Sequence, residues 1–269
     1  MPADRSLPIG VFDSGVGGLT VVRALMERLP LENIVYFGDT ARVPYGIKSV
    51  ATIGHYTEQI TDFLMARGVK MLIVACNTMA AVAGDVVRQK AGDVPVLDVI
   101  DAGAQAAVAG STGRAIGVIG TPTTINSNAY ARRMHALDPG VRVYSQACPL
   151  FVPLVEEGWL DHPVTRMTAL EYLKPVLAEH VDSLVLGCTH YPLLKPLLMD
   201  VAGRDVRLVD SAITVAEQAA QTLVRLNLAN TGEQHSAAQF CVTDIPLRFQ
   251  TIGERFLGRS LGQIERIEW

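Results

Sequence analysis

Short apolar runs that alternate with helix-like stretches constrain the fold of this chain more than any other feature. Runs this short and this apolar are typical of strands that are buried on both faces. Helices between such strands make the strands parallel and place the helices on both faces of the sheet. In the first half, strands are predicted at residues 9–12, 33–37, 71–75 and 94–97, and helices at residues 19–29, 49–67 and 78–89.

The order of elements starts again in the second half. Residues 115–120, 141–144, 184–188 and 206–210 resemble, in the same order, the runs that begin at residues 8, 34, 73 and 95. One match would mean little, because all βα units look alike, but four matches in order indicate a duplicated unit. We therefore predict an α/β protein with two similar parallel-sheet domains related by a pseudo-two-fold axis.

The tail after the second unit has its own elements. A helix is predicted at residues 214–228, a strand at 239–242, a helix at 246–257 and a strand at 264–267. We expect this tail to return to the first unit. The predicted first domain is then residues 1–98 plus 210–269, and the second is residues 99–209.

Composition excludes several classes of protein. The 269 residues are 49% hydrophobic with a net charge of -4 and no Lys/Arg run, so neither a nucleic-acid surface nor an anionic-membrane surface is expected. The apolar runs are far shorter than a membrane span, and residues 1–6 show no apolar signal core, so we expect a cytoplasmic protein. The four cysteines form no CxxC motif and stand near no second His at ligand spacing, so no metal site is expected.

Two cysteines stand at matching places in the two halves. Cys76 and Cys188 each end an apolar run, and each is followed by small polar residues suited to the start of a helix. A thiol there lies near the positive end of the helix dipole, which favours the thiolate. A lone free cysteine is more often a buried small hydrophobe, which is our expectation for Cys148 and Cys241. Two thiols that face one cleft, however, provide a base on one side of a substrate and an acid on the other.

Other polar residues follow the predicted strands, where ligands of parallel α/β sheets bind. The glycine-rich run at residues 15–18 offers backbone amides to a carboxylate or phosphate, but it lacks the P-loop pattern. Taken singly, Asp13 is best explained as a helix N-cap and Glu157 as an exposed helix-end residue, whereas Thr121 belongs either to a substrate-binding segment or to a capped turn. His190 is either a core or surface residue or a group that sets the protonation state of the thiol beside it.

Considered together, these motifs resemble a known family. Residues 13–21, 44–46, 76–78 and 186–192 look like the signatures of the glutamate racemases, part of the cofactor-independent aspartate/glutamate racemase superfamily. The resemblance runs from about residue 8 to about residue 212 and is weaker in the tail. It implies interconversion of L- and D-glutamate for peptidoglycan synthesis, without pyridoxal phosphate or metal. It also implies an active site between the two domains and, often, a homodimer.

The resemblance also implies individual roles. Cys76 and Cys188 are the implied acid/base pair, with Cys188 serving the L-enantiomer and Cys76 the D-enantiomer. Asp13 and His190 are the implied supporting catalytic groups. The implied substrate-binding residues are Asp13, Ser14, Tyr45, Gly46, Asn77, Thr78, Thr121, Glu157, Thr189 and His190.

Three alternatives stay open on the sequence. A racemase of aspartate or of a hydantoin would use the same thiols, and assays on both amino acids would separate it. A binding protein is the second, since some relatives inhibit DNA gyrase, although nothing in this sequence points to gyrase. A thiol hydrolase with one nucleophilic cysteine is the third, but it leaves the second strand-end thiol unexplained.

Overall fold

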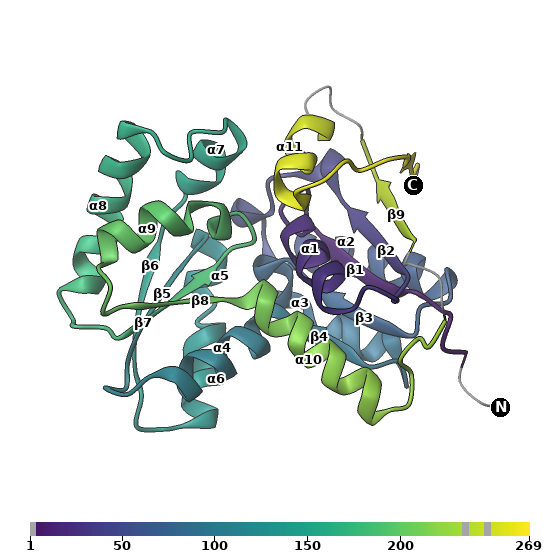
Figure 1. The fold of residues 1–269 in the computed structure, drawn as a ribbon, viewed down its shortest axis with the longest axis horizontal. Helices are drawn as coiled ribbons and strands as arrows, with labels where there is room; N and C mark the ends of the chain where they lie inside the picture. Colours follow the sequence, from purple (N-terminus) through teal and green to yellow (C-terminus); the bar gives the residue numbers. More distant parts are fainter. Residues whose placement is uncertain (1–3, 233–236, 245–248) are drawn as a thin grey trace.

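The chain forms two lobes, each built on its own parallel sheet (Figure 1). The structure, a computed structural model, describes residues 4–232, 237–244 and 249–269. The larger sheet has the strand order β10-β9-β2-β1-β3-β4, and the smaller has the order β6-β5-β7-β8. Every strand pair in both sheets is parallel, as the alternating pattern predicts.

The strands are β1 (Ile9–Asp13), β2 (Ile34–Gly38), β3 (Met71–Val74), β4 (Val96–Asp98), β5 (Ala115–Gly120), β6 (Arg142–Ala147), β7 (Ser183–Gly187), β8 (Arg207–Asp210), β9 (Ala238–Val242) and β10 (Ile264–Arg266). The α-helices are α1 (Leu19–Arg28), α2 (Val50–Ala66), α3 (Asn77–Ala91), α4 (Val99–Gly110), α5 (Pro122–Asn126), α6 (Ala129–Leu137), α7 (Phe151–Glu156), α8 (Pro163–Leu177), α9 (Lys195–Ala202), α10 (Ser211–Arg225) and α11 (Phe249–Leu257). Three 3-10 helices complete the set, η1 (Thr40–Arg42), η2 (Tyr45–Ile47) and η3 (Tyr191–Leu194).

The four strands matched in the sequence take the same places in both sheets. The order β2-β1-β3-β4 in the larger sheet corresponds to β6-β5-β7-β8 in the smaller. The carboxyl ends of β3 and β7, each of which leads to a cysteine, are therefore equivalent positions. The predicted fold class, two similar parallel-sheet α/β domains, is confirmed.

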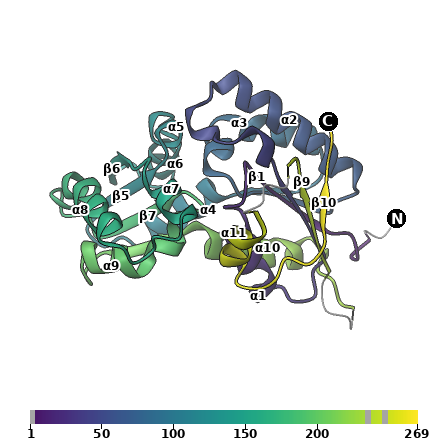
Figure 2. The ribbon, with the colours of Figure 1, turned by 90° about the horizontal axis from the view of Figure 1, so that it is seen from above.

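Alternating side chains bury both faces of each sheet. In β3, Met71 and Ile73 join the apolar cluster that contains α1 and α10 residues, whereas Leu72 and Val74 join the cluster formed with α2 and α3. This alternation is the two-residue period of a strand. Viewed from above, α2 and α3 lie on one side of the larger sheet and α1, α10 and α11 on the other (Figure 2).

The tail returns to the larger sheet. β9 pairs with β2, and β10 pairs with β9, so both tail strands extend the sheet on its β2 side. Helix α10 packs against both α1 and α4, and it thereby connects the two lobes. Residues 245–248 lie outside the described part of the chain, so the predicted start of the helix at residue 246 lies there too.

Two local expectations were wrong. Helix α1 begins after Gly18 with no side-chain cap, so Asp13 is not its N-cap. Cys188 is not followed directly by an α-helix; the short η3 begins three residues later, with His190 at its N-cap. The helix-dipole argument therefore applies to Cys76, which is the N-cap of α3, but hardly to Cys188.

Over the described residues, no helix combines the length and the apolar character that a membrane span requires.

Candidate active site

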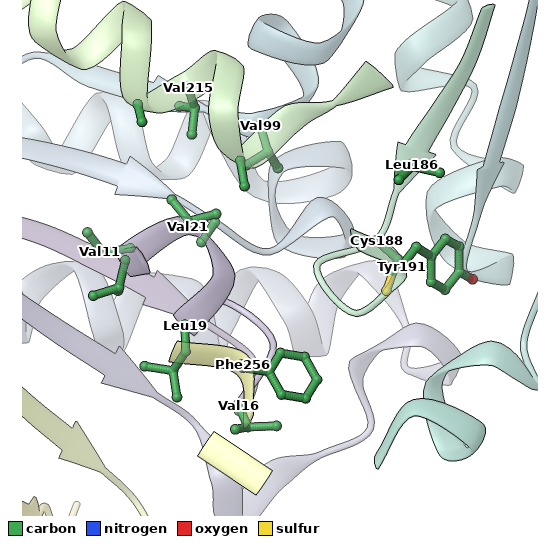
Figure 3. Close-up of a cluster of buried hydrophobic side chains, with 14 of the residues drawn as sticks. Val11, Val16, Leu19, Val21, Val99, Leu186, Cys188, Tyr191, Val215 and Phe256 are labelled. Atoms are coloured by element: carbon green, nitrogen blue, oxygen red, sulfur yellow. The ribbon is translucent and has the colours of Figure 1, made fainter. Parts of the chain in front are cut away.

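Both cysteines sit just beyond the carboxyl ends of central strands and are buried. Cys76 is 5% exposed and Cys188 is 6% exposed. Cys188 and Tyr191 belong to an apolar cluster that continues into the first domain through Val11, Val16 and others. Figure 3 shows the second-domain members of this cluster opposite the residues of β1 and α1. The domains therefore share one apolar core that includes Cys188.

The surroundings of Cys76 favour its thiol form. Its Sγ lies 3.5 Å from the hydroxyl of Ser14. Burial, followed by the nearby charge of Asp13, raises the pKa of Cys76 to about 12. The Met79 amide at the start of α3 lowers this pKa, as the helix-start argument expects, but burial outweighs it.

Cys188 has a cationic neighbour. Its Sγ lies 3.9 Å from Nδ1 of His190, and Nε2 of His190 lies 2.9 Å from Oε1 of Glu156. Burial by itself lowers the pKa of His190, but the interactions with Cys188 and Glu156 outweigh it and raise this pKa to about 10. These contacts favour the imidazolium form, whose positive charge faces the sulfur of Cys188.

The charge of Asp13 interacts with groups on both sides of the site, His190 and Cys76. Its carboxyl is 1% exposed, and Oδ2 accepts a hydrogen bond from the Gly15 amide at 3.1 Å. Burial raises the pKa of Asp13, while the charge of His190 opposes that rise. Asp13 also raises the pKa of Cys76, so one carboxyl group interacts electrostatically with both halves of the site. Its Oδ1 has no hydrogen-bond partner among the described residues.

The glycine-rich loop after β1 touches the loop that carries Cys188. A Cβ atom at Gly17 would lie 2.2 Å from Oγ1 of Thr189 and 2.6 Å from Nδ1 of His190. The Thr20 hydroxyl also donates to the carbonyl of Thr189 at 3.2 Å. The glycine is therefore needed for close approach between the domains.

Asn77 is fixed from the opposite domain. The hydroxyl of Tyr130, on α6, donates to Oδ1 of Asn77 at 2.8 Å. Nδ2 of Asn77 is buried and finds no hydrogen-bond partner in the described structure. A buried amide N–H without a partner costs about 1–3 kcal/mol. This donor is well suited to a substrate carboxylate.

Hydroxyl groups from both domains meet beside Asn77. Oγ1 of Thr78 lies 3.1 Å from Oγ1 of Thr121 and 3.4 Å from Oγ1 of Thr124. Thr121 also caps α5, since its hydroxyl accepts from the Thr124 amide at 3.3 Å. The capped-turn interpretation of Thr121 therefore holds alongside its place near Thr78. Thr124 was not singled out from the sequence.

Tyr45 and Gly46 approach the second domain from the first. Tyr45 is buried, and its hydroxyl donates to the carboxylate of Asp39. The carbonyl of Gly46 accepts from the Thr123 hydroxyl at 2.7 Å, and a Cβ atom at Gly46 would lie 3.2 Å from Cβ of Thr121. The segment between β2 and α2 thus joins the two domains at this edge.

The glutamate that contacts His190 is Glu156, which the sequence reasoning passed over. Glu156 is the last residue of α7, with its side chain 41% exposed. Glu157, the expected candidate, follows at the C-cap and is exposed. The adjacent pair of glutamates was visible in the sequence, but only the placement of α7 distinguishes them.

The other two cysteines are also buried, and each has an oxygen atom near its sulfur. Sγ of Cys148 lies 3.6 Å from the carbonyl of Gln146, and Sγ of Cys241 lies 3.6 Å from Oε2 of Glu265. Burial, with a smaller effect from Cys188, raises the pKa of Cys148. Among the described residues, no group of three or more His, Cys, Asp or Glu side chains is arranged to hold a metal ion.

Comparison with known proteins identifies the class that this fold and site define. The model of the Asp/Glu/hydantoin racemase family matches residues 18–219, so the chain belongs to that family. Its relatives within the family include the glutamate racemase of Syntrophus aciditrophicus, which is 68% identical over 97% of this chain and 96% of its own length. The glutamate racemase of Neisseria meningitidis is 62% identical over 98% and 97% of the two chains. The resemblance to the glutamate racemases is thereby confirmed.

Solved structures agree. A glutamate racemase from Francisella tularensis in complex with D-glutamate has a TM-score of 0.93, with 43% identity and 98% of both chains covered. By contrast, an aspartate racemase from Picrophilus torridus has a TM-score of 0.57 and 16% identity over 83% of this chain and 99% of that one, so it shares the fold alone. The aspartate and hydantoin alternatives are therefore not favoured.

Proposed function

We propose that this protein interconverts L-glutamate and D-glutamate with two thiols, Cys76 and Cys188, one of which removes the α-proton while the other delivers a different proton to the opposite face. The carrying observation is the pair of buried thiols at equivalent strand ends, each with its own polar partner, Ser14 on one side and His190 on the other. The identity to glutamate racemases along nearly the whole chain supports glutamate as the substrate.

The two thiols begin a turnover in different states. Cys76, with its pKa raised to about 12 by burial and by Asp13, is the proton donor. Cys188, beside the cationic His190, is the base. For L-glutamate, the thiolate of Cys188 removes the proton from Cα and the thiol of Cys76 delivers another proton to the opposite face. The thiols finish in exchanged states, and proton exchange with solvent restores the starting pair.

The carbanion needs stabilisation because no cofactor is proposed to delocalise it. Hydrogen bonds to the α-carboxylate stabilise charge that moves onto it during proton removal. The donors proposed for this role are the Asn77 amide and the hydroxyls of Thr78 and Thr189. Exclusion of water from these buried side chains strengthens each hydrogen bond.

The proposed activity is tested by following optical rotation or circular dichroism of L- and D-glutamate with the purified protein and no added cofactor. Both enantiomers should approach the same racemic end point, with aspartate inert under the same conditions. Chelators and carbonyl reagents should leave the rate unchanged. No change with glutamate, or loss with EDTA that a metal ion restores, would refute the proposal.

The proposal also covers the biological role, the location, the oligomeric state and the domain division of the protein. We infer that the D-glutamate serves peptidoglycan synthesis in the cytoplasm, and that the protein works as a homodimer. The domain division, residues 1–98 plus 210–269 against residues 99–209, is also kept as a proposal, supported by the assignment of β9 and β10 to the larger sheet. Cell fractionation tests the cytoplasmic location, light scattering tests the homodimer and limited proteolysis tests the domain division.

A further inference from the structure

The segment that carries Tyr45 is fastened to the returning strand β9 through one buried carboxylate. Asp39 is 0% exposed, and its two oxygens accept from different parts of the chain. Oδ1 accepts from the hydroxyl of Thr243 at 2.8 Å, and Oδ2 accepts from the hydroxyl of Tyr45. Arg42 adds its guanidinium 3.6 Å from Oδ2. The carboxylate therefore links Tyr45 to Thr243, which lies 204 positions after Asp39 in the sequence.

Further bonds hold the same two segments together. The hydroxyl of Thr243 accepts from the Ala41 amide at 2.9 Å while it donates to Asp39. The Asp244 amide donates to the Thr40 hydroxyl at 2.8 Å, and that hydroxyl donates back to the Asp244 carbonyl. The hydroxyl of Thr243, the residue that follows β9, thus bonds to both the backbone and the buried carboxylate of the loop.

The far end of this loop meets the second domain. The carbonyl of Gly46 accepts from the Thr123 hydroxyl, so a displacement of residues 39–47 would disturb this contact between the domains. A buried carboxylate that loses one of its donors costs free energy, and neighbouring groups shift to satisfy it. Because Tyr45 is one of those neighbours, its position depends on Thr243.

We propose that Thr243 and Asp39 are positioning residues that hold Tyr45 for substrate binding, so that the tail outside the duplicated units helps to shape the active site. This inference rests on the proposed function for the identity of the substrate. It assigns the tail a role in binding, since neither Thr243 nor Asp39 needs to touch glutamate. Loss of Thr243 should therefore raise KM and leave kcat nearly unchanged.

The test uses Thr243→Val, which keeps the shape of the side chain and removes its hydroxyl. Its matched control is Thr61→Val, because Thr61 is also buried but its hydroxyl donates to the Thr57 carbonyl within α2. Thr243→Ser keeps the hydroxyl. Thr243→Val should raise KM for both enantiomers roughly tenfold, whereas Thr61→Val and Thr243→Ser should stay within about twofold of the parent.

A second arm reads the position of Tyr45 without relying on activity. In protein labelled with 3-fluorotyrosine, Tyr45→Phe identifies the fluorine signal of Tyr45 among the seven tyrosines. That signal should move in Thr243→Val and in Asp39→Asn but not in Thr61→Val. Asp39→Asn also serves if Thr243→Val does not fold.

The double variant Thr243→Val with Tyr45→Phe should bind no worse than the weaker-binding single variant, since both changes break one linkage. An unmoved Tyr45 signal, an unchanged KM in Thr243→Val, or effects that multiply in the double variant would overturn the inference. A parent protein that does not racemise glutamate would instead defeat the proposed function, and the fluorine arm would still decide the linkage.

Discussion

Nε2 of His190 lies 2.9 Å from Oε1 of Glu156, while Nδ1 of the same ring faces Sγ of Cys188 at 3.9 Å. The half-exposed carboxylate therefore stabilises the positive charge of an imidazole ring that faces a buried thiol. Such a ring is held in place by the carboxylate, and it offers the thiolate both a hydrogen bond and a positive charge.

Removal of the charge on Glu156 should weaken catalysis through His190. Glu156→Gln is expected to lower kcat/KM roughly tenfold, because the glutamine keeps a hydrogen-bond acceptor but loses the charge. Glu157→Gln is the paired comparison, and we expect the smaller loss there, since Glu156 is the residue that contacts the ring. Steady-state kinetics on both enantiomers decide it. A larger loss in Glu157→Gln would move the role to the residue expected from the sequence.

The raised pKa of His190 predicts a pH-dependent contribution to stability. Despite the opposing effect of burial, its partners raise this pKa from 6.5 to about 10. The imidazolium's contribution is then fully present below about pH 6.5 and is lost as the pH rises through about 10. Urea unfolding at several pH values should show the parent's stability advantage over His190→Gln shrinking across that window. An advantage that grows with pH would contradict the assignment.

Gly17 should not tolerate a side chain. Gly17→Ala places a methyl group 2.2 Å from the Thr189 hydroxyl, and the resulting shift should cost about 1–3 kcal/mol of stability and most of the activity. Gly54→Ala is the control, because nothing lies within 4 Å of its Cβ position in α2. That variant should gain about 0.5–1 kcal/mol through lower chain entropy and stay active. Thermal unfolding measures both, and equal stability of the two variants would argue against the contact.

The hydroxyl of Tyr130 should matter for binding through Asn77. Tyr130→Phe keeps the ring but frees Oδ1 of Asn77, so the amide loses its fixed orientation. We expect KM to rise by roughly three- to tenfold with little change in kcat. Tyr144→Phe, at a half-buried tyrosine on β6 of the same domain, should leave KM unchanged. If both variants behave alike, the orientation of Asn77 does not depend on Tyr130.

The strands were predictable because buried parallel strands leave continuous apolar runs, and the duplicated order indicated which strand ends are equivalent. The linkage from Asp39 to Thr243 was not predictable, because it depends on β9 pairing beside β2. The choice between Glu156 and Glu157 depends on how the short α7 is seated. The raised pKa of Cys76 was not predictable, because a sequence shows the helix start but not the depth of burial.

The most direct test of the two-thiol account is racemisation of L-glutamate in D2O. With two thiols, D-glutamate formed early should carry deuterium at Cα, because the proton it receives comes from a solvent-equilibrated thiol. The remaining L-glutamate should keep almost all its protium. Cys76→Ala and Cys188→Ala should each abolish racemisation. Equal early deuterium in both enantiomers, or near-full activity in either cysteine variant, would contradict the account.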